Sequence, residues 1–221
     1  MKKIAIDGPS GAGKSTMAKL AARELGFTYV DTGAMYRALG LKALENNIEI
    51  SDAEAVCKML SNTEIELKFE GGAQRIFTDG ADVSDKIRTP QVSLAASDIS
   101  ALTAVRLKMV DIQRRIADTR DVVMDGRDIG TYVLPGADVK IFLTADIDER
   151  SRRRYNELKE RGADVLFEDV KTDMERRDKN DSTREMAPLA AAEGAVIIDT
   201  TGYEIPQSVE LILNTIKEKL H

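Results

Sequence analysis

A glycine-rich run that ends in a lysine and two hydroxyl residues is the stretch of this sequence best suited to chemistry. It matches the pattern G-x-x-x-x-G-K-[ST], and its members are Gly8, Pro9, Ser10, Gly11, Ala12, Gly13, Lys14, Ser15 and Thr16. The apolar residues 4–6 before it predict a strand, and residues 17–25 after it have helical spacing. A strand, a tight turn and a helix start aim backbone N–H groups and the positive end of the helix dipole at one point. The run therefore predicts a binding site for a nucleoside triphosphate.

Two side chains of this loop have specific expected roles. Lys14 is expected to reach the β- and γ-phosphates, and the Ser15 hydroxyl is expected to coordinate Mg²⁺. The plain alternative is a glycine-rich turn with a surface lysine. The presence of the strand, the loop and the helix in this order favours the phosphate site.

Arginines recur where the predicted elements end near this loop. Arg37 and Arg127 follow predicted strand ends, whereas Arg150, Arg153 and Arg154 lie on one predicted helix. Phosphoryl transfer depends on positioning and charge neutralisation more than on covalent help. Fixed guanidinium groups are suited to bringing two polyanions together. The alternative for the helical arginines is a solvated helix face.

A third group of charges is spaced for one face of a helix. Arg177, Asp181 and Arg184 fall at i, i+4 and i+7, so they share a face if the helix extends that far. They could form a ligand site or simple surface salt bridges. Tyr36 has a similar ambiguity, because it could be a core aromatic residue.

The acceptor of the phosphoryl group is not determined by the loop. A phosphate monoester has a second pKa of about 6, so it arrives ionised at neutral pH and needs no general base. A sugar hydroxyl would need a carboxylate base, for which Asp125 or Asp128 is available. The Asn-Lys-x-Asp signature of GTPases is absent, and motor ATPases are expected to be longer than this chain. A small-molecule kinase is therefore favoured.

The composition excludes several other classes of protein. The 221 residues suit one α/β domain, and 43% hydrophobic with 32% charged residues indicates a soluble globular chain. The only histidine is His221, which excludes histidine-based triads and most zinc sites. The net charge of −6 argues against a nucleic-acid surface. The lone Cys57, the lack of a long apolar run and a strand that begins within four residues predict a cytoplasmic protein without a signal peptide or membrane span.

Five short apolar runs separated by helical segments predict a three-layer α/β fold with a parallel sheet. The predicted strands are residues 4–6, 27–30, 121–124, 139–143 and 195–198. The predicted helices include residues 34–46, 51–60, 101–116, 146–161, 167–180 and 206–220, with a capping box at residues 51–54. Ligands bind beyond the carboxyl ends of such strands. The first three strands end in Asp7-Gly8, Asp31-Thr32-Gly33 and Asp125-Gly126-Arg127-Asp128, which predicts three polar clusters at one rim.

Two segments stand apart from this β/α alternation. A β-rich piece at about 63–90, with turns at Gly71-Gly72 and Asp79-Gly80, is interpreted as an insertion. The highly charged segment at about 146–165 has few apolar residues and is interpreted as a mobile lid. The remaining core then comprises residues 1–62, 91–145 and 166–221 of a single domain.

Four segments together resemble the bacterial cytidylate kinases, which are P-loop nucleoside monophosphate kinases. They are IAIDGPSGAGK at 4–14, DTGAMYR at 31–37, DGRDIGT at 125–131, and the stretch from Arg177 to Arg184 followed by APL at 187–189. The resemblance covers essentially the whole chain, including the β-rich insertion. It implies a P-loop kinase fold with a core, an acceptor-binding insertion and a lid. It also implies transfer of the ATP γ-phosphoryl group to CMP or dCMP with Mg²⁺, giving CDP or dCDP and ADP.

The resemblance also implies roles for single residues. Arg37, Arg127 and Arg184 would contact the acceptor phosphate or its surroundings; Ser97, Arg106 and Asp128 would read the cytosine; and Arg177 with Asp181 would hold the ribose. We further expect Tyr36 and Asp125 on the CMP side, Arg153 beside ATP, and Arg154 with Lys14 and Arg127 at the reacting phosphate. Ser97 and Arg106 are nine residues apart and would lie on opposite faces of one continuous helix, so a break between them is predicted.

Two other functions remain open at this stage. One is another small P-loop kinase, whose acceptor is a different nucleotide or a sugar or cofactor hydroxyl. The other is a non-catalytic nucleotide-binding module, against which the intact Lys14, Ser15 and arginine set speaks. We expect ATP and CMP or dCMP as the partners of a monomeric chain, with no nucleic acid or membrane partner.

Overall fold

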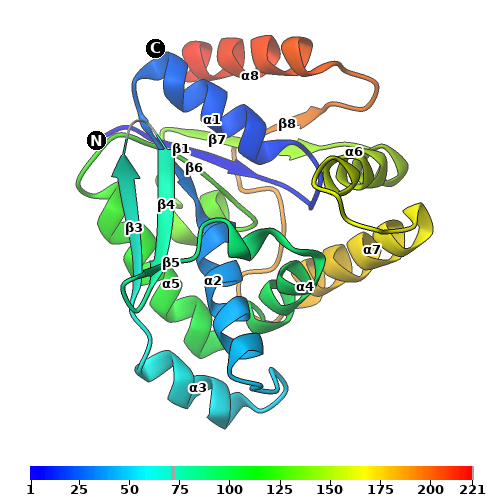
Figure 1. Cartoon of the computed structure of the whole chain (residues 1–221). Coiled ribbons are helices and arrows are strands. Elements are labelled where there is room, and N and C mark those ends of the chain that lie inside the picture. Colours follow the sequence, from blue (N-terminus) through cyan, green and yellow to red (C-terminus); the bar gives the residue numbers. More distant parts are fainter. Residues whose placement is uncertain (71–72, 221) are drawn as a thin grey trace.

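The centre of the molecule is a five-stranded parallel sheet, seen in a computed structural model that describes residues 1–70 and 73–220 (Figure 1). The strand order is β2-β6-β1-β7-β8. The bounds are Lys3–Asp7 for β1, Thr28–Asp31 for β2, Val122–Gly126 for β6, Val139–Thr144 for β7 and Val196–Asp199 for β8. All five residues of β6 are buried, as expected for a parallel strand covered on both faces. The predicted sheet and its five strands are confirmed.

Helices cover both faces of this sheet, because alternate strand residues point to opposite sides. Ile4 and Ile6 pack with α1 (Lys14–Leu25) and α8 (Ile205–Leu220), which lie together above the sheet in Figure 1. Ala5 instead packs with α5 (Thr103–Ala117) and with the short π-helical turn η2 (Ile129–Val133). The result is the expected three-layer α/β arrangement.

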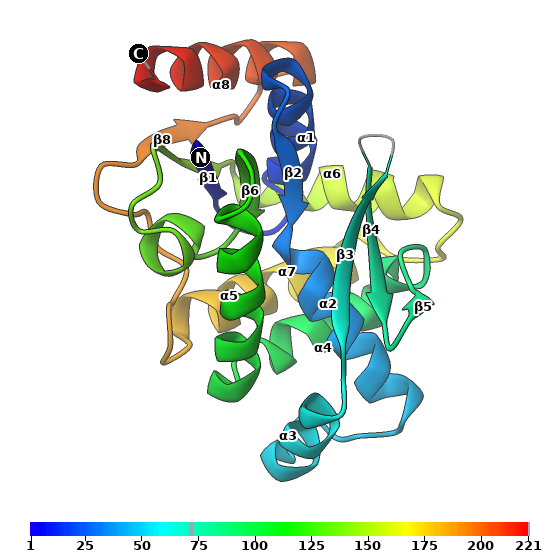
Figure 2. The same ribbon diagram turned by 90° about the vertical axis from the view of Figure 1, so that its left-hand side faces the viewer.

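The β-rich piece forms a separate antiparallel sheet beside α2 (Thr32–Glu45), as Figure 2 shows. Its strands are β3 (Ile65–Glu70), β4 (Ala73–Thr78) and β5 (Ala81–Asp82), and the 3₁₀ turn η1 (Lys86–Arg88) follows. Ile65 and Ile76 pack with α2 and α3 (Ala53–Ser61) in one apolar cluster. The predicted turn at Gly71-Gly72 lies outside the described residues.

The start of α3 differs from the sequence prediction by one residue. The cap is Asp52, whose carboxylate accepts a hydrogen bond from the Ala55 backbone at 3.0 Å. The predicted capping box, which began at Ser51, is therefore wrong. Aspartate and serine are both common N-cap residues, and here the carboxylate of Asp52 caps the helix.

The predicted break between Ser97 and Arg106 is confirmed. Helix α4 (Pro90–Ile99) ends at Ser100, and α5 begins after Leu102, whose backbone is extended. The two helices therefore have different directions, and Ser97 and Arg106 can face the same space.

The charged segment contains α6 (Ile147–Glu160), which packs in a helical hairpin with α7 (Phe167–Thr183) of the predicted core. The expectation that this segment has few apolar anchors is confirmed, since Leu158 is the one buried apolar side chain of α6 and packs with Val170 and Met174 of α7. These apolar residues are spread over two helices, so neither helix alone shows a strong apolar stripe. Among the described residues, no helix is both long and apolar enough to cross a membrane.

Candidate active site

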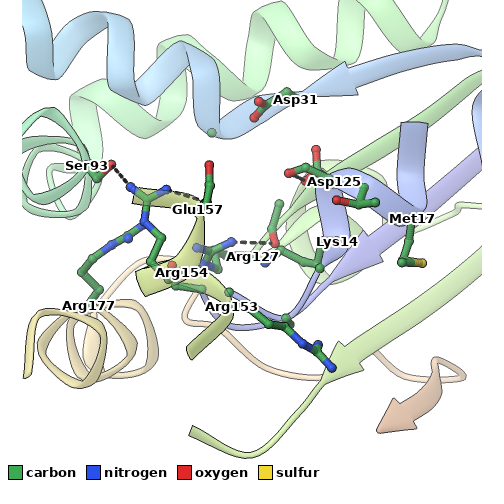
Figure 3. A pocket seen from close by; sticks show the side chains of 18 of the residues that line it. Lys14, Met17, Asp31, Ser93, Asp125, Arg127, Arg153, Arg154, Glu157 and Arg177 are labelled. Atoms are coloured by element: carbon green, nitrogen blue, oxygen red, sulfur yellow. Dashed lines mark hydrogen bonds and ion pairs between the residues drawn. The ribbon is translucent and has the colours of Figure 1, made fainter. Parts of the chain in front are cut away.

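A cavity of about 860 Å³ opens at the carboxyl ends of the strands, with the glycine-rich loop on one side of it. Its walls come from the loop, the ends of β2, β6 and β8, and parts of α4, α6 and α7. Figure 3 shows side chains from these separate elements around one space. Of the three predicted polar clusters, those at 31–33 and 125–128 line this cavity, whereas Asp7 and Gly8 do not, because the Asp7 carboxylate accepts from the backbone of Ile129 and Gly130.

The loop conformation depends on its glycines. Gly11 and Gly13 have φ of 72° and 86°, values that favour glycine. At Gly8, with φ of 148°, an added Cβ would lie 1.9 Å from the Leu143 carbonyl oxygen, so no larger residue fits beside β7. Gly8 and Pro9 lie at the base of the loop and do not line the cavity, whereas the predicted residues from Ser10 to Thr16 do.

Lys14 is held inside the site, with only 6% of its surface exposed. Its Nζ donates a hydrogen bond to the Pro9 carbonyl oxygen at 2.6 Å. Burial, and then the neighbouring positive charge of Arg127, lower the pKa of Lys14 well below its usual value. A buried lysine beside an arginine is a strong site for an anion.

Ser15 and Asp125 face each other beside the loop. The Ser15 hydroxyl donates to the Asp125 carboxylate at 2.7 Å, and the Tyr29 hydroxyl donates to the other carboxylate oxygen at 3.1 Å. Burial and then the nearby charge of Asp31 raise the pKa of Asp125 to about 6. A cation between Ser15 and Asp125 would favour the ionised carboxylate.

This pair fits a magnesium ion that also binds substrate phosphates. Mg²⁺ prefers oxygen ligands and is usually held by one or two carboxylates together with phosphate oxygens. In the described part of the chain, no group of three or more His, Cys, Asp or Glu side chains could hold a metal alone. The sequence prediction placed Asp125 with CMP, whereas its contacts with Ser15 place it next to the donor loop.

In one wall of the cavity, two arginines share one carboxylate. Arg106 and Arg184 both donate to Asp128, the second at 3.2 Å, and Arg106 is only 1% exposed. The Arg106 guanidinium also lies 5.7 Å from the centre of the Tyr36 ring. Within the described residues, the buried Oγ of Ser97 and Nε of Arg106 have no hydrogen-bond partner. These orphaned groups are suited to a polar ligand.

Arg184 lies one residue beyond the end of α7, with an extended backbone. The three charges at i, i+4 and i+7 therefore do not all lie on the helix. Arg127 donates to Asp181 at 2.7 Å, and Arg184 approaches the other oxygen of Asp181 at 3.8 Å. Asp181 therefore contacts both Arg127, at the end of β6, and Arg184, just beyond the end of α7.

The other predicted arginines line the cavity from different elements. Arg37 comes from α2, Arg153 and Arg154 from α6, and Arg177 from α7. Arg154 donates to Glu157 at 2.8 Å and to Ser93 at 3.4 Å, which joins α6 to α4 across the site (Figure 3). Burial, and then Arg127, lower the pKa of Arg177 to about 10. This excess of positive charge is suited to phosphate groups.

Arg150 is not part of this set. It donates to the Ser10 carbonyl oxygen at 2.9 Å and to Asp178 at 2.6 Å, behind the loop. Arg150 therefore does not line the cavity with Arg153 and Arg154 of the same helix. Its guanidinium instead holds the loop to the two helices of the hairpin.

Sequence reasoning missed the part of the site that follows β8. Thr200, Tyr203 and Ile205 line the cavity near Arg153, which donates to the Thr200 carbonyl oxygen at 2.9 Å. The predicted fifth strand could have indicated these residues, because its carboxyl end must lie at the same edge of the sheet as the ends of the other four strands. Arg88 and Ser93 also line the cavity and were not predicted as site residues, and Asp31, which was predicted only as part of the polar rim, lines it too.

Comparison with known proteins gives a consistent result over the whole chain. The family model described as cytidylate kinase matches residues 4–218. The chain belongs to the cytidylate kinase family. It is 52% identical over 215 residues to a cytidylate kinase of Caldicellulosiruptor saccharolyticus, which covers 96% of this chain and 95% of the relative. It is 51% identical over 223 residues to a cytidylate kinase of Desulfitobacterium hafniense, which covers 100% and 96% of the two chains.

Similarity to more distant solved structures concerns the fold alone. An uncharacterized protein from Eubacterium ventriosum has a TM-score of 0.54 with 13% sequence identity, and the match covers 98% of this chain and 99% of the other. All predicted site residues except Gly8 and Pro9 line the cavity.

Proposed function

We infer that this member of the cytidylate kinase family transfers the γ-phosphoryl group of ATP to CMP or dCMP, giving CDP or dCDP and ADP. The observation that supports this most is the cavity itself. The phosphate-binding loop and the arginines of α2, β6 and α7 line the same space, so a donor and an acceptor phosphate would meet between them. Family membership gives independent support.

The donor triphosphate would lie on the loop. Lys14 would face its transferred phosphate, and Ser15 with Asp125 would hold the metal ion, which we propose is Mg²⁺. The ion would neutralise charge on the phosphate oxygens when bound. Arg153, Thr200, Tyr203 and Ile205 would surround the far end of ATP, since they line the cavity together.

The acceptor phosphate would lie among Arg37, Arg127 and Arg177. The Nε atoms of Arg37 and Arg177 are buried and have no partner in the described part of the chain, so they are available for an anion. A phosphate monoester is already ionised at neutral pH, and these arginines would offset the repulsion between the two substrates. Arg154 would stabilise the charge that spreads over the phosphoryl group during transfer.

The site is less suited to an acceptor that would react through a hydroxyl group. Its proton would have to go to a carboxylate, and the two candidates are already engaged. Asp128 accepts from two arginines, and Asp125 accepts from two hydroxyl groups. Both are therefore suited to structural or metal-binding roles rather than to removing a proton.

The base would be read next to the Arg106–Asp128 pair. Cytosine presents an exocyclic amine that donates hydrogen bonds, beside N3 and O2 that accept them. Uracil differs at the first two positions, because its O4 accepts and its N3–H donates. The unpartnered Ser97 hydroxyl could accept from the amine, and the Arg106 guanidinium could donate to N3 or O2. Arg177 and Asp181 would bind the ribose between base and phosphate.

The deciding experiment is an acceptor panel in a coupled assay of ADP release. CMP and dCMP are expected to give a kcat/KM at least about tenfold above UMP and AMP, because a mismatched base leaves buried polar groups unpaired. Small-molecule alcohols are expected to give only the background rate of ATP hydrolysis. Turnover of an alcohol but not of CMP would support the other small-molecule kinases, and no turnover with any acceptor would support a non-catalytic module.

The cellular compartment, the oligomeric state and the partners of the enzyme are also proposals. We place the enzyme in the cytoplasm, since its lone and exposed Cys57 thiol suits a reducing compartment. We further propose that it acts as a monomer on small molecules, without a nucleic-acid or membrane partner. The division into core, acceptor-binding insertion and lid is likewise a prediction.

A further inference from the structure

The β3–β5 insertion contributes little to the cavity wall, yet one of its side chains holds that wall. Of its described residues, only Arg88 lines the cavity. Gln74, on β4, reaches the end of β2 instead. Its Oε1 accepts a hydrogen bond from the Asp31 backbone N–H at 2.8 Å, and its Nε2 donates to the Asp31 carbonyl oxygen at 3.2 Å.

This contact has the form of strand pairing. In a β-strand, the N–H and C=O of one residue point to the same side, and an antiparallel neighbour can exchange both hydrogen bonds with it. β2 is an edge strand, with β6 on its other side. The Gln74 amide therefore takes the place of a peptide group of a neighbouring strand, at the last residue of β2.

Asp31 is also the residue that fixes the start of α2. One carboxylate oxygen accepts from the Ala34 backbone at 2.9 Å, and the other pairs with Arg37 at 2.8 Å. Burial alone would raise the pKa of Asp31, but Arg37 and the Ala34 N–H lower it, so the carboxylate is ionised and holds Arg37. A displacement of Asp31 would move this arginine in the cavity.

We propose that Gln74 is a positioning residue for the acceptor phosphate, acting through Asp31 on Arg37. The proposal rests on the proposed function, because that function assigns Arg37 to the acceptor phosphate. It gives the insertion a specific role in acceptor binding, although almost none of the insertion lines the cavity. The two side-chain hydrogen bonds of Gln74 go to Asp31 and not to the loop of residues 8–16, so the larger effect is expected on the acceptor.

The test compares Gln74→Met with the wild type and with Glu66→Gln. Methionine has a similar length but cannot form the two hydrogen bonds, and Glu66 is exposed on the neighbouring strand β3 of the same hairpin. Gln74→Met is expected to raise the KM for CMP about tenfold and to leave the KM for ATP unchanged. Glu66→Gln is expected to change neither value.

Two further measurements separate positioning from general damage. Amide exchange at Asp31 and Ala34 is expected to become faster in unliganded Gln74→Met, whatever the substrate is. In an Arg37→Met background, adding Gln74→Met is expected to cause little further loss in CMP binding, because the two residues act in series.

Three outcomes have distinct meanings. An unchanged KM for CMP in Gln74→Met, with an active wild type, would overturn the proposal. Equal rises in the KM values of CMP and ATP would also overturn it, since they would indicate a general structural role. A wild type that does not phosphorylate CMP would instead refute the proposed function, and Asp31 amide exchange would still test the contact.

Discussion

Lys14 lowers the stability of the folded protein in the absence of a ligand. Its ammonium group is buried next to Arg127 and, in the described structure, donates to one neutral carbonyl group. A lysine whose pKa is lowered by folding destabilises the folded state wherever the group is charged in the unfolded chain. A bound phosphate would reverse this effect.

Lys14→Met is therefore expected to reduce kcat by about 10²–10³ because it removes charge stabilisation at the transferred group. The same variant is expected to have a higher Tm than the wild type at pH 7, since a buried charge is replaced by an apolar side chain. Steady-state kinetics and thermal unfolding check the two effects. Near-normal kcat in the folded variant would refute the role of Lys14.

Arg106 and Asp128 are expected to determine the preference for CMP over UMP. Arg106→Met is expected to reduce the ratio of kcat/KM for CMP over UMP at least about tenfold, with the KM for ATP nearly unchanged. The reason is that Arg106 and Asp128 form one hydrogen-bonded pair that lines the cavity. Asp128→Asn, which conserves shape, provides the second variant. A ratio that stays the same in both folded variants would contradict the assignment.

Among the elements, the α6–α7 hairpin is joined to the donor loop in a way that limits its motion. Arg150 of α6 donates to the Ser10 carbonyl oxygen, and Asp178 of α7 accepts from the Ser10 N–H at 3.3 Å. An added Cβ at Gly11 would lie 2.8 Å from the Arg150 carbonyl oxygen, so loop and hairpin are in close contact. Lid closure stays a prediction, and any such motion has to occur around this contact.

Arg150→Met is expected to raise the KM for ATP about tenfold, with little effect on the KM for CMP, because the loop loses a charged hydrogen bond that holds its shape. Lys159→Met, at an exposed position of the same helix, is the matched control. Measuring both KM values for both variants checks this prediction. A larger effect on CMP than on ATP would show that Arg150 acts on the acceptor instead.

In the whole molecule, two buried carboxylates with raised pKa values lower the stability as the pH rises, whereas Asp31 and Asp181, whose pKa values are lowered, act in the opposite direction. Burial raises the pKa of Asp7 and Asp125 from 3.8 to about 6. The folded protein therefore binds these protons more tightly than the unfolded chain does. Between about pH 4 and pH 6, their contribution favours the folded state as the pH falls, and at pH 7 each ionised group costs roughly 3 kcal/mol.

Asp125→Asn is accordingly expected to raise the Tm at pH 8 and to lose most of this gain by pH 4, where the wild-type carboxyl is protonated. Asparagine can still bond both Ser15 and Tyr29, so the comparison mainly removes the charge. Thermal unfolding across this pH range checks the expectation. A difference in Tm that does not vary with pH would mean that the ionisation of Asp125 is not responsible.

The sequence predicted the general plan of this molecule better than its internal contacts. The five strands and the polar rim follow from short apolar runs, whose carboxyl ends must meet in a parallel sheet. Arg150 and Arg154, in contrast, are one helical turn apart, and only the packing determines that one holds the loop and the other faces the cavity. Gln74 and Asp31 are 43 positions apart, and no local pattern indicates that they meet.

The position of β1 has a consequence for the order in which the protein can form during synthesis. β1 lies between β6 and β7, with Lys3 beside Val122 and Ile4 beside Val139, so the first strand made has no neighbour until most of the chain exists. The apolar cluster between residues 34 and 109 needs no such distant partner. In a chain growing from its N-terminus, this cluster can assemble early, whereas the glycine-rich loop remains without its sheet until late.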